Sequence, residues 1–141
     1  MLACISLMFG CSCSRVSAQG SAQATDQATV IAGAEMKAEY HKISAAEARK
    51  MMSEQKDLIL LDVRTDAEYR ERHIAGAVLI PDYEIKDRAG NELPDKKAVI
   101  LVYCRSGRRS ENAARELVGM GYLNVYDIGG IINWPYETVE D

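Results

Sequence analysis

Residues 99–110 read VILVYCRSGRRS, a continuous apolar run that ends in a cysteine and passes into an arginine-rich loop. The apolar part is typical of a strand that is buried on both faces of a parallel sheet. We expect this strand at 98–103 and a helix that begins at Ser110. A loop of this kind turns its backbone N–H groups inward around Cys104. Those dipoles, the helix macrodipole and the nearby guanidinium groups favour the thiolate over the thiol, which predicts a nucleophilic cysteine in an anion-binding loop.

Cys104 is the only cysteine after residue 13, since the other three are Cys4, Cys11 and Cys13. A single thiol cannot form an internal disulfide and supplies too few ligands for a structural zinc ion. The alternative is a buried cysteine that packs as a small hydrophobic residue. The loop directly after Cys104 favours the reactive role, because packing alone requires no run of arginine and glycine.

Composition limits the function classes. A chain of 141 residues is long enough for one domain with an additional segment, and its 48% hydrophobic and 27% charged residues are ordinary for a soluble globular protein. The net charge of −4 gives no reason to expect a nucleic acid as partner. Arg105, Arg108 and Arg109 nevertheless gather beside Cys104, and such a local cluster in an acidic protein favours a small anionic substrate.

The N-terminal segment, residues 1–18, predicts an export signal peptide. It holds the short apolar run MLACISLMFG and ends in the small-residue pattern VSA at 16–18, although no Lys or Arg precedes the run. The segment MFGC also resembles a lipoprotein processing site with Cys11 as the lipidated residue. Either alternative predicts an exported protein, periplasmic or lipid-anchored in the bacterial envelope, and the run is too short to span a membrane.

Residues 19–39 are rich in Ala, Gln, Ser, Thr and Gly and predict a flexible linker, followed by a single domain at 40–141. In that domain, the S/T-x-x-E pattern marks helix starts at Ser44 and Thr65. Strands and helices alternate, which predicts an α/β fold with a central parallel sheet of about five strands and helices on both faces. Reactive groups of such sheets gather at the carboxyl ends of the strands. The strands that the pattern places are 58–61, 77–80, 98–103 and 124–128, and Gly121 should end the helix that follows the cysteine loop.

Three stretches resemble the single-domain rhodanese-like sulfurtransferase family. They are LLDVRTDAEYRERHIAGA at 60–77, YCRSGRRS at 103–110 and NVYDIGGIINW at 124–134. The resemblance implies a rhodanese-like fold and a thiosulfate sulfurtransferase-like enzyme. Such an enzyme moves sulfane sulfur from thiosulfate or a persulfide donor, through a persulfide on Cys104, to a thiol or cyanide acceptor. The chemistry follows from a thiolate attacking the outer sulfur of the donor, with the new persulfide anion held by loop N–H groups.

The resemblance also implies roles for individual residues. Cys104 is the catalytic residue, while Asp62 and Arg64 support the loops beside it. For this pair a purely structural alternative stays open, in which Asp62 caps backbone N–H groups and Arg64 pairs with a carboxylate. His73 is expected in a turn. The loop that cradles the substrate comprises Arg105, Ser106, Gly107, Arg108 and Arg109.

The expected partners are a small anionic sulfur donor and a thiol acceptor such as a thioredoxin-like protein. No metal, organic cofactor or nucleic acid is expected, and a membrane is contacted only through a lipidated N-terminus.

Two alternative functions belong to other classes of protein. A cysteine phosphatase or arsenate reductase uses C-x5-R, whereas here Arg109 lies five residues after Cys104 and Ser110 six, a loop suited to one sulfur atom. A persulfide carrier or sensing module would keep the cysteine but show little turnover of its own.

Overall fold

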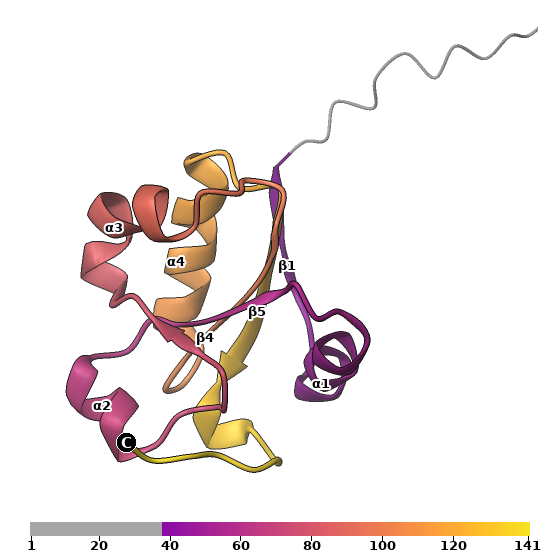
Figure 1. Cartoon of the computed structure of the whole chain (residues 1–141), viewed down its shortest axis with the longest axis vertical. Helices are drawn as coiled ribbons and strands as arrows, with labels where there is room; N and C mark the ends of the chain where they lie inside the picture. Colours follow the sequence, from indigo (N-terminus) through magenta and orange to yellow (C-terminus); the bar gives the residue numbers. More distant parts are fainter. Residues whose placement is uncertain (1–37) are drawn as a thin grey trace, which may run out of the picture. The chain divides into compact units, whose positions relative to one another are not determined.

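A computed structural model describes residues 38–141, which form one five-stranded sheet (Figure 1). The strand order is β1-β5-β4-β2-β3, and every pair of neighbouring strands is parallel. The α/β fold with a central parallel sheet is therefore confirmed. The strands are β1 (Glu39–Lys42), β2 (Ile59–Asp62), β3 (Val78–Leu79), β4 (Val99–Cys104) and β5 (Asn124–Gly130).

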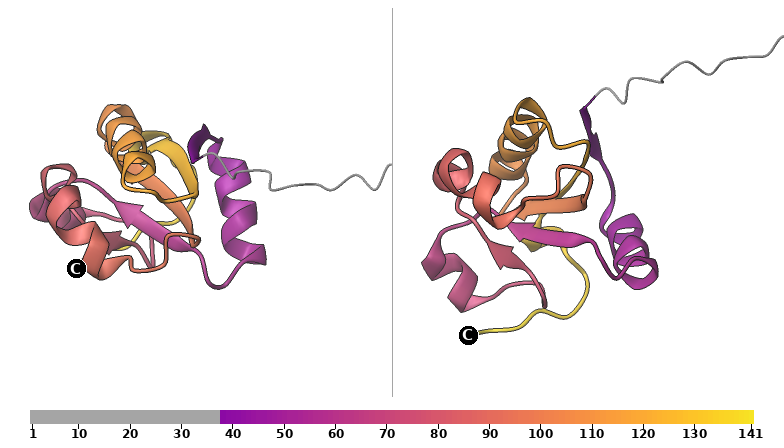
Figure 2. Two further views of the ribbon diagram at one scale, coloured as in Figure 1. Left: turned by 90° about the horizontal axis from the view of Figure 1, so that it is seen from above. Right: turned by 45° about the horizontal axis from the view of Figure 1, so that its top comes forward.

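Helices cover both faces of this sheet, as Figure 2 shows. Helix α1 (Ala45–Glu54) packs on one face, while α3 (Ile85–Glu92) and α4 (Arg108–Gly119) pack on the other. Helix α2 (Asp66–Glu71) follows β2 at the carboxyl edge of the strands. Two short 3-10 helices complete the described part, η1 (Asp82–Glu84) and η2 (Ile131–Asn133).

The core has two parts, one on each face of the sheet. Along β4, Ile100 and Val102 belong to the cluster under α3 and α4, whereas Leu101 and Tyr103 belong to the cluster under α1. All four side chains are at most 1% exposed. This explains why the strand reads as a continuous apolar run, because both of its faces are covered.

Local signals place both helix starts correctly. The Ser44 hydroxyl accepts the N–H of Glu47 at 3.2 Å, and the Glu47 carboxylate accepts the N–H of Ser44 at 2.8 Å. Thr65 and Glu68 form the same reciprocal pair at the start of α2. Each pair satisfies two backbone N–H groups that the helix itself leaves free, so the capping boxes are confirmed.

Several elements differ from the sequence prediction, and three of these differences have a clear physical reason. Strand β1 was not expected, because it is a short edge strand with mostly exposed side chains and has no buried apolar pattern. Helix α4 begins at Arg108 rather than Ser110, since the carbonyl of Gly107 already accepts the N–H of Glu111 at 3.1 Å. Strand β5 extends to Gly130 because a bulge beside Val102 lets the glycine pair continue the ladder.

The predicted export signal at 1–18, with Cys4, Cys11 and Cys13, lies outside the described residues, as does the predicted linker apart from residues 38 and 39. Within residues 38–141, no helix is long and apolar enough to cross a membrane.

Candidate active site

Cys104 is the last residue of β4 and lies at the carboxyl edge of the sheet, as predicted. It pairs with Gly130 of β5, and the neighbouring strand β2 ends at the same edge with Asp62. The Cys104 side chain has no exposed surface.

The loop after Cys104 is only three residues long, and its last residue contacts the sulfur. The N–H of Gly107 donates to Cys104 Sγ at 3.0 Å, and α4 begins at the next residue. Gly107 has a φ of 106°, a left-handed conformation that glycine adopts without a steric penalty. A backbone N–H and a helix N-terminus beside one sulfur atom stabilise negative charge on it.

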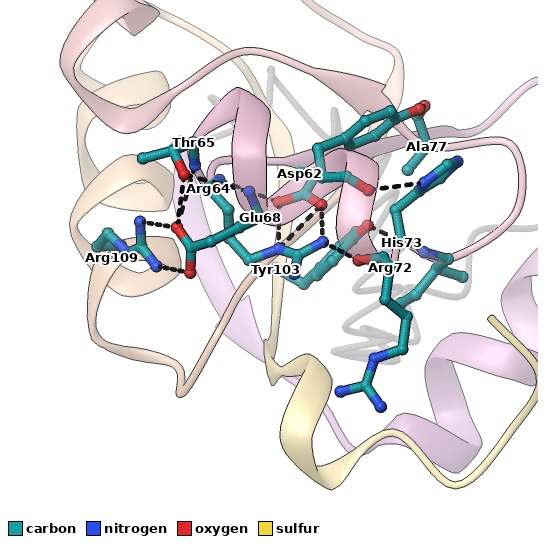
Figure 3. A network of polar contacts seen from close by, with 11 residues as sticks. Asp62, Arg64, Thr65, Glu68, Arg72, His73, Ala77, Tyr103 and Arg109 are labelled. Carbon is teal, nitrogen blue, oxygen red and sulfur yellow. Dashed lines mark hydrogen bonds and ion pairs between the residues drawn. The ribbon is translucent and has the colours of Figure 1, made fainter. Parts of the chain in front are cut away.

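The Arg109 guanidinium binds the carboxylate of Glu68 (Figure 3). It is therefore not free to bind a substrate. Its two terminal nitrogens donate to the two carboxylate oxygens at 2.8 and 2.7 Å. This contact, with smaller contributions from Thr65, lowers the pKa of Glu68 to about 2. The Glu68 carboxylate in turn raises the pKa of Arg109. Cys104 also contributes to the raised pKa of Arg109, so this arginine still acts on the sulfur in spite of its partner. Arg105 and Arg108 form no ion pair among residues 38–141.

Because of Glu68, the stability of the fold should depend on pH in the acid range. Because its pKa lies below the ordinary value of 4.5, the carboxylate stabilises the folded chain above about pH 4.5, and this contribution disappears as the pH falls towards 2. We expect Glu68→Gln to lower the free energy of unfolding near neutral pH and to weaken its pH dependence between about 4.5 and 2. Urea unfolding at a series of pH values measures both effects. Glu71→Gln, an exposed neighbour on the same helix, is the control, and an identical pH profile for both variants would contradict the prediction.

Asp62 and Arg64 form a buried ion pair that braces the turn after α2 (Figure 3). An Arg64 terminal nitrogen donates to Asp62 at 2.6 Å and to the carbonyl of Arg72 at 2.6 Å, and the Arg64 N–H caps the same carboxylate at 2.9 Å. Tyr103 accepts the N–H of Ile74 at 3.1 Å, and burial, followed by the negative charge of Asp62, raises its pKa. Asp62 thus caps a backbone N–H and Arg64 pairs with a carboxylate, as the structural alternative describes, and the pair is bound to the turn at Arg72.

A second polar network lies under the cysteine loop. The Ser110 hydroxyl lies 2.6 Å from Asp127 Oδ1 and 3.0 Å from the carbonyl of Gly107, and the N–H of Gly129 donates to the same carboxylate oxygen at 3.0 Å. Ser110 and Asp127 are both fully buried. The network ties the first turn of α4 to β5. This network was not predicted from the sequence. A charged residue such as Asp127 inside a buried strand does, however, indicate that a polar partner lies nearby.

Gly130 forms the floor of the loop. A Cβ atom at this position would lie 2.5 Å from the carbonyl oxygen of Arg105 and 2.6 Å from the Cα of Ser106. Only a glycine lets the loop backbone approach β5 this closely. Within residues 38–141, no group of three or more His, Cys, Asp or Glu side chains is placed to hold a metal ion.

Known proteins are similar to this chain over most of the described residues. A family model for the rhodanese-like domain matches residues 44–135. The chain is 41% identical over 71 residues to the thiosulfate sulfurtransferase PspE of Escherichia coli, covering 50% of this chain and 68% of that protein. It is 35% identical over 96 residues to the thiosulfate sulfurtransferase GlpE of Coxiella burnetii, covering 67% and 87%. Among solved structures, a rhodanese with anions from E. coli superposes with a TM-score of 0.56 at 36% identity, covering 59% of this chain and 98% of the other.

Proposed function

Because this chain belongs to the rhodanese-like domain family and is a rhodanese-type sulfurtransferase, we propose that sulfane sulfur passes through a persulfide on Cys104. The donor is thiosulfate or a small persulfide, and the acceptor is a thiol, or cyanide in the laboratory. The observation that carries the proposal is the 3.0 Å contact from the Gly107 N–H to Cys104 Sγ at the start of α4.

In the first step, the Cys104 thiolate attacks the outer sulfur of thiosulfate. A bond forms between Sγ and that sulfur, the sulfur–sulfur bond of the donor breaks, and sulfite leaves with the electron pair. In the second step, an acceptor thiolate attacks the outer sulfur of the persulfide, and Cys104 leaves as a thiolate. The Gly107 N–H and the α4 N-terminus stabilise the negative charge on sulfur at each stage.

Mass spectrometry of the intact protein tests the proposal. After incubation with thiosulfate, the protein should gain the mass of one sulfur atom, and a thiol should remove that mass. Peptide mapping should place the added sulfur on Cys104. A protein that gains no sulfur, or gains it elsewhere, would contradict the proposal.

The carrier alternative is the second candidate, and the complete burial of Cys104 favours it. A carrier would accept one sulfur per chain but would turn over slowly with small thiols. Steady-state rates with thiosulfate and small thiols, compared with the rate of persulfide formation, separate the two. A phosphatase role is disfavoured because Glu68 already occupies the guanidinium of Arg109.

Arg108 and Arg109 should affect different steps. Arg108→Gln removes a charge that has no ion-pair partner in the described part of the chain, so we expect KM for thiosulfate to rise. Loss of one charge-assisted contact, about 1.5–3 kcal/mol, corresponds to about ten- to a hundredfold. An uncharged sulfane-sulfur donor should be less affected, and high salt should weaken thiosulfate turnover.

Arg109→Gln instead leaves Glu68 without its partner, and we expect it to reduce turnover of charged and uncharged donors alike and to lower the melting temperature. Steady-state kinetics of both variants with both donors checks this difference. Equal losses for the two donors in Arg108→Gln would mean that Arg108 organises the loop rather than attracting the anion.

For the N-terminal segment, we propose export, on the strength of the apolar run and the small residues at 16–18. The exported form should begin at Gln19 or at a lipidated Cys11. N-terminal analysis of the protein from its own host decides between the two, and a mature chain that retains Met1 would contradict export.

A further inference from the structure

A cleft of about 410 Å³ lies beside the cysteine loop. Arg105 of the loop forms one wall, and Glu71 and Arg72 at the end of α2 form another. Glu140 comes from the C-terminal tail, which is held in place by reciprocal backbone hydrogen bonds of 2.8 Å between Val139 and His73. The cleft thus adjoins the loop that follows Cys104, while Cys104 itself is buried and does not line it.

The charges in this cleft are balanced in sign. Three arginines and three glutamates line it, and two of the six, Arg64 and Glu68, are bound to Asp62 and Arg109. The remaining four are exposed and form no ion pair within residues 38–141. These four are Arg72, Arg105, Glu71 and Glu140.

Such a surface discriminates between ligands by their charge pattern. A polyanion would be attracted by Arg72 and Arg105 but repelled by Glu71 and Glu140, and a cation would meet the opposite arrangement. A ligand with one carboxylate and one ammonium group can satisfy both signs. Ile132, 59% exposed, adds an apolar contact for its carbon atoms.

We propose that this cleft binds the body of the sulfur acceptor, and that the acceptor is a small zwitterionic thiol of the cysteine or cysteinyl-peptide class. The inference rests on the proposed sulfur transfer through Cys104. Thiosulfate is much smaller than the cleft, whose volume lies in the range of about 300–1,000 Å³ that is typical of small-molecule sites. The cleft therefore suits the acceptor better than the inorganic donor.

The transfer step is balanced without a further reagent. The thiol loses its proton to solvent, and its thiolate attacks the outer sulfur of the Cys104 persulfide. A sulfur–sulfur bond forms in the product persulfide, the bond between that sulfur and Cys104 Sγ breaks, and Cys104 keeps the electron pair as a thiolate. The cleft contributes by holding the acceptor thiolate close to the persulfide.

A series of thiols tests the proposal in single-turnover experiments. The protein is loaded with sulfur from thiosulfate, freed of donor, and mixed with cysteine, N-acetylcysteine, cysteamine or 2-mercaptoethanol. Each rate constant is divided by the fraction of thiolate present at the assay pH. We expect cysteine to exceed each single-charge analogue by about two- to fivefold, the range of an exposed ion pair, and the neutral thiol to be slowest.

Two variants assign the charges. Arg72→Gln should reduce the advantage of cysteine over cysteamine, because the carboxylate keeps only Arg105 as a partner. Glu71→Gln should reduce the advantage of cysteine over N-acetylcysteine, because the ammonium group keeps only Glu140. Lys86→Gln, from an exposed ion pair between α3 and α4, is the control and should leave the order of thiols unchanged.

The proposal is overturned if cysteine is no faster than its single-charge analogues, or if Arg72→Gln and Glu71→Gln slow all thiols equally. A protein that gains no sulfur in the loading step would overturn the proposed function itself, and this outcome is visible before any thiol is added.

Discussion

Cys104→Ser is expected to reduce sulfur transfer to the level of the protein-free reaction while the fold stays intact. A serine hydroxyl is nearly isosteric with the thiol but is not ionised near neutral pH, so it cannot attack the donor sulfur. Its oxygen can still accept the N–H of Gly107, which donates to Cys104 Sγ at 3.0 Å in the structure. Intact-protein mass spectrometry after incubation with thiosulfate, together with thermal unfolding, measures both parts of the prediction.

Cys104→Ala is the matched control for stability. It is equally inactive, but it leaves the half-buried Gly107 N–H without its acceptor. Loss of one hydrogen bond costs about 0.5–1.5 kcal/mol, so the alanine variant should unfold at a lower temperature than the serine variant. Transfer by Cys104→Ser at a rate near that of the unchanged protein would assign the chemistry to a different group.

Much of the fold could be predicted because its signals are local. The run before Cys104 is apolar at every position, since β4 is covered on both faces, and Ser44 and Thr65 each carry a capping partner three residues ahead. Strand β1 had no such signal. It is held by pairing with β5, whose sequence lies more than eighty residues away, and its own side chains are mostly exposed.

The candidate site likewise has features that local sequence predicts and features that depend on residues distant in the sequence. The place of Cys104 at the carboxyl edge of the sheet, beside a loop N–H group, follows from a strand, a short loop and a helix that are adjacent in sequence. The contact between Arg109 and Glu68 could not be predicted in this way, because Glu68 lies 41 residues earlier. The sequence around Glu68 indicates only that it caps helix α2. The buried contact between Ser110 and Asp127 likewise joins two elements that only the folded sheet brings together.

The Arg109 contact changes how the positive charge beside the sulfur is understood. From the sequence, three neighbouring arginines predict a strong field that attracts an anionic donor. In the structure, Arg109 is paired with Glu68, whereas Arg105 and Arg108 have no ion-pair partner among residues 38–141. The loop therefore combines positive charge that is partly neutralised with one N–H group, that of Gly107, which is directed at the sulfur.

Gly130→Ala should be the most damaging substitution outside Cys104. The backbone of Gly130, with φ −112° and ψ 139°, is extended and suits alanine, so the only obstacle is steric. The new methyl group would lie 2.5 Å from the carbonyl oxygen of Arg105 and 2.6 Å from the Cα of Ser106. Both are backbone atoms that cannot rotate away, so the loop itself must move.

A displaced loop would carry the Gly107 N–H away from Cys104 Sγ. We expect the rate of persulfide formation to fall by about a hundredfold, the scale of effect that a misplacement of about 1 Å can produce. Crowding should also lower the free energy of unfolding by about 1–3 kcal/mol. Single-turnover kinetics with thiosulfate and urea unfolding measure the two effects.

Gly90→Ala is the matched control for Gly130→Ala, because Gly90 lies in helix α3 and a Cβ there would meet nothing within 4 Å. That variant should be more stable by about 0.5–1 kcal/mol, since alanine loses less backbone entropy than glycine in a helix, and its transfer rate should not change. If Gly130→Ala formed the persulfide as fast as Gly90→Ala, the position of the loop would not depend on its close approach to β5. Reactivity would then come from the cysteine and the helix N-terminus alone.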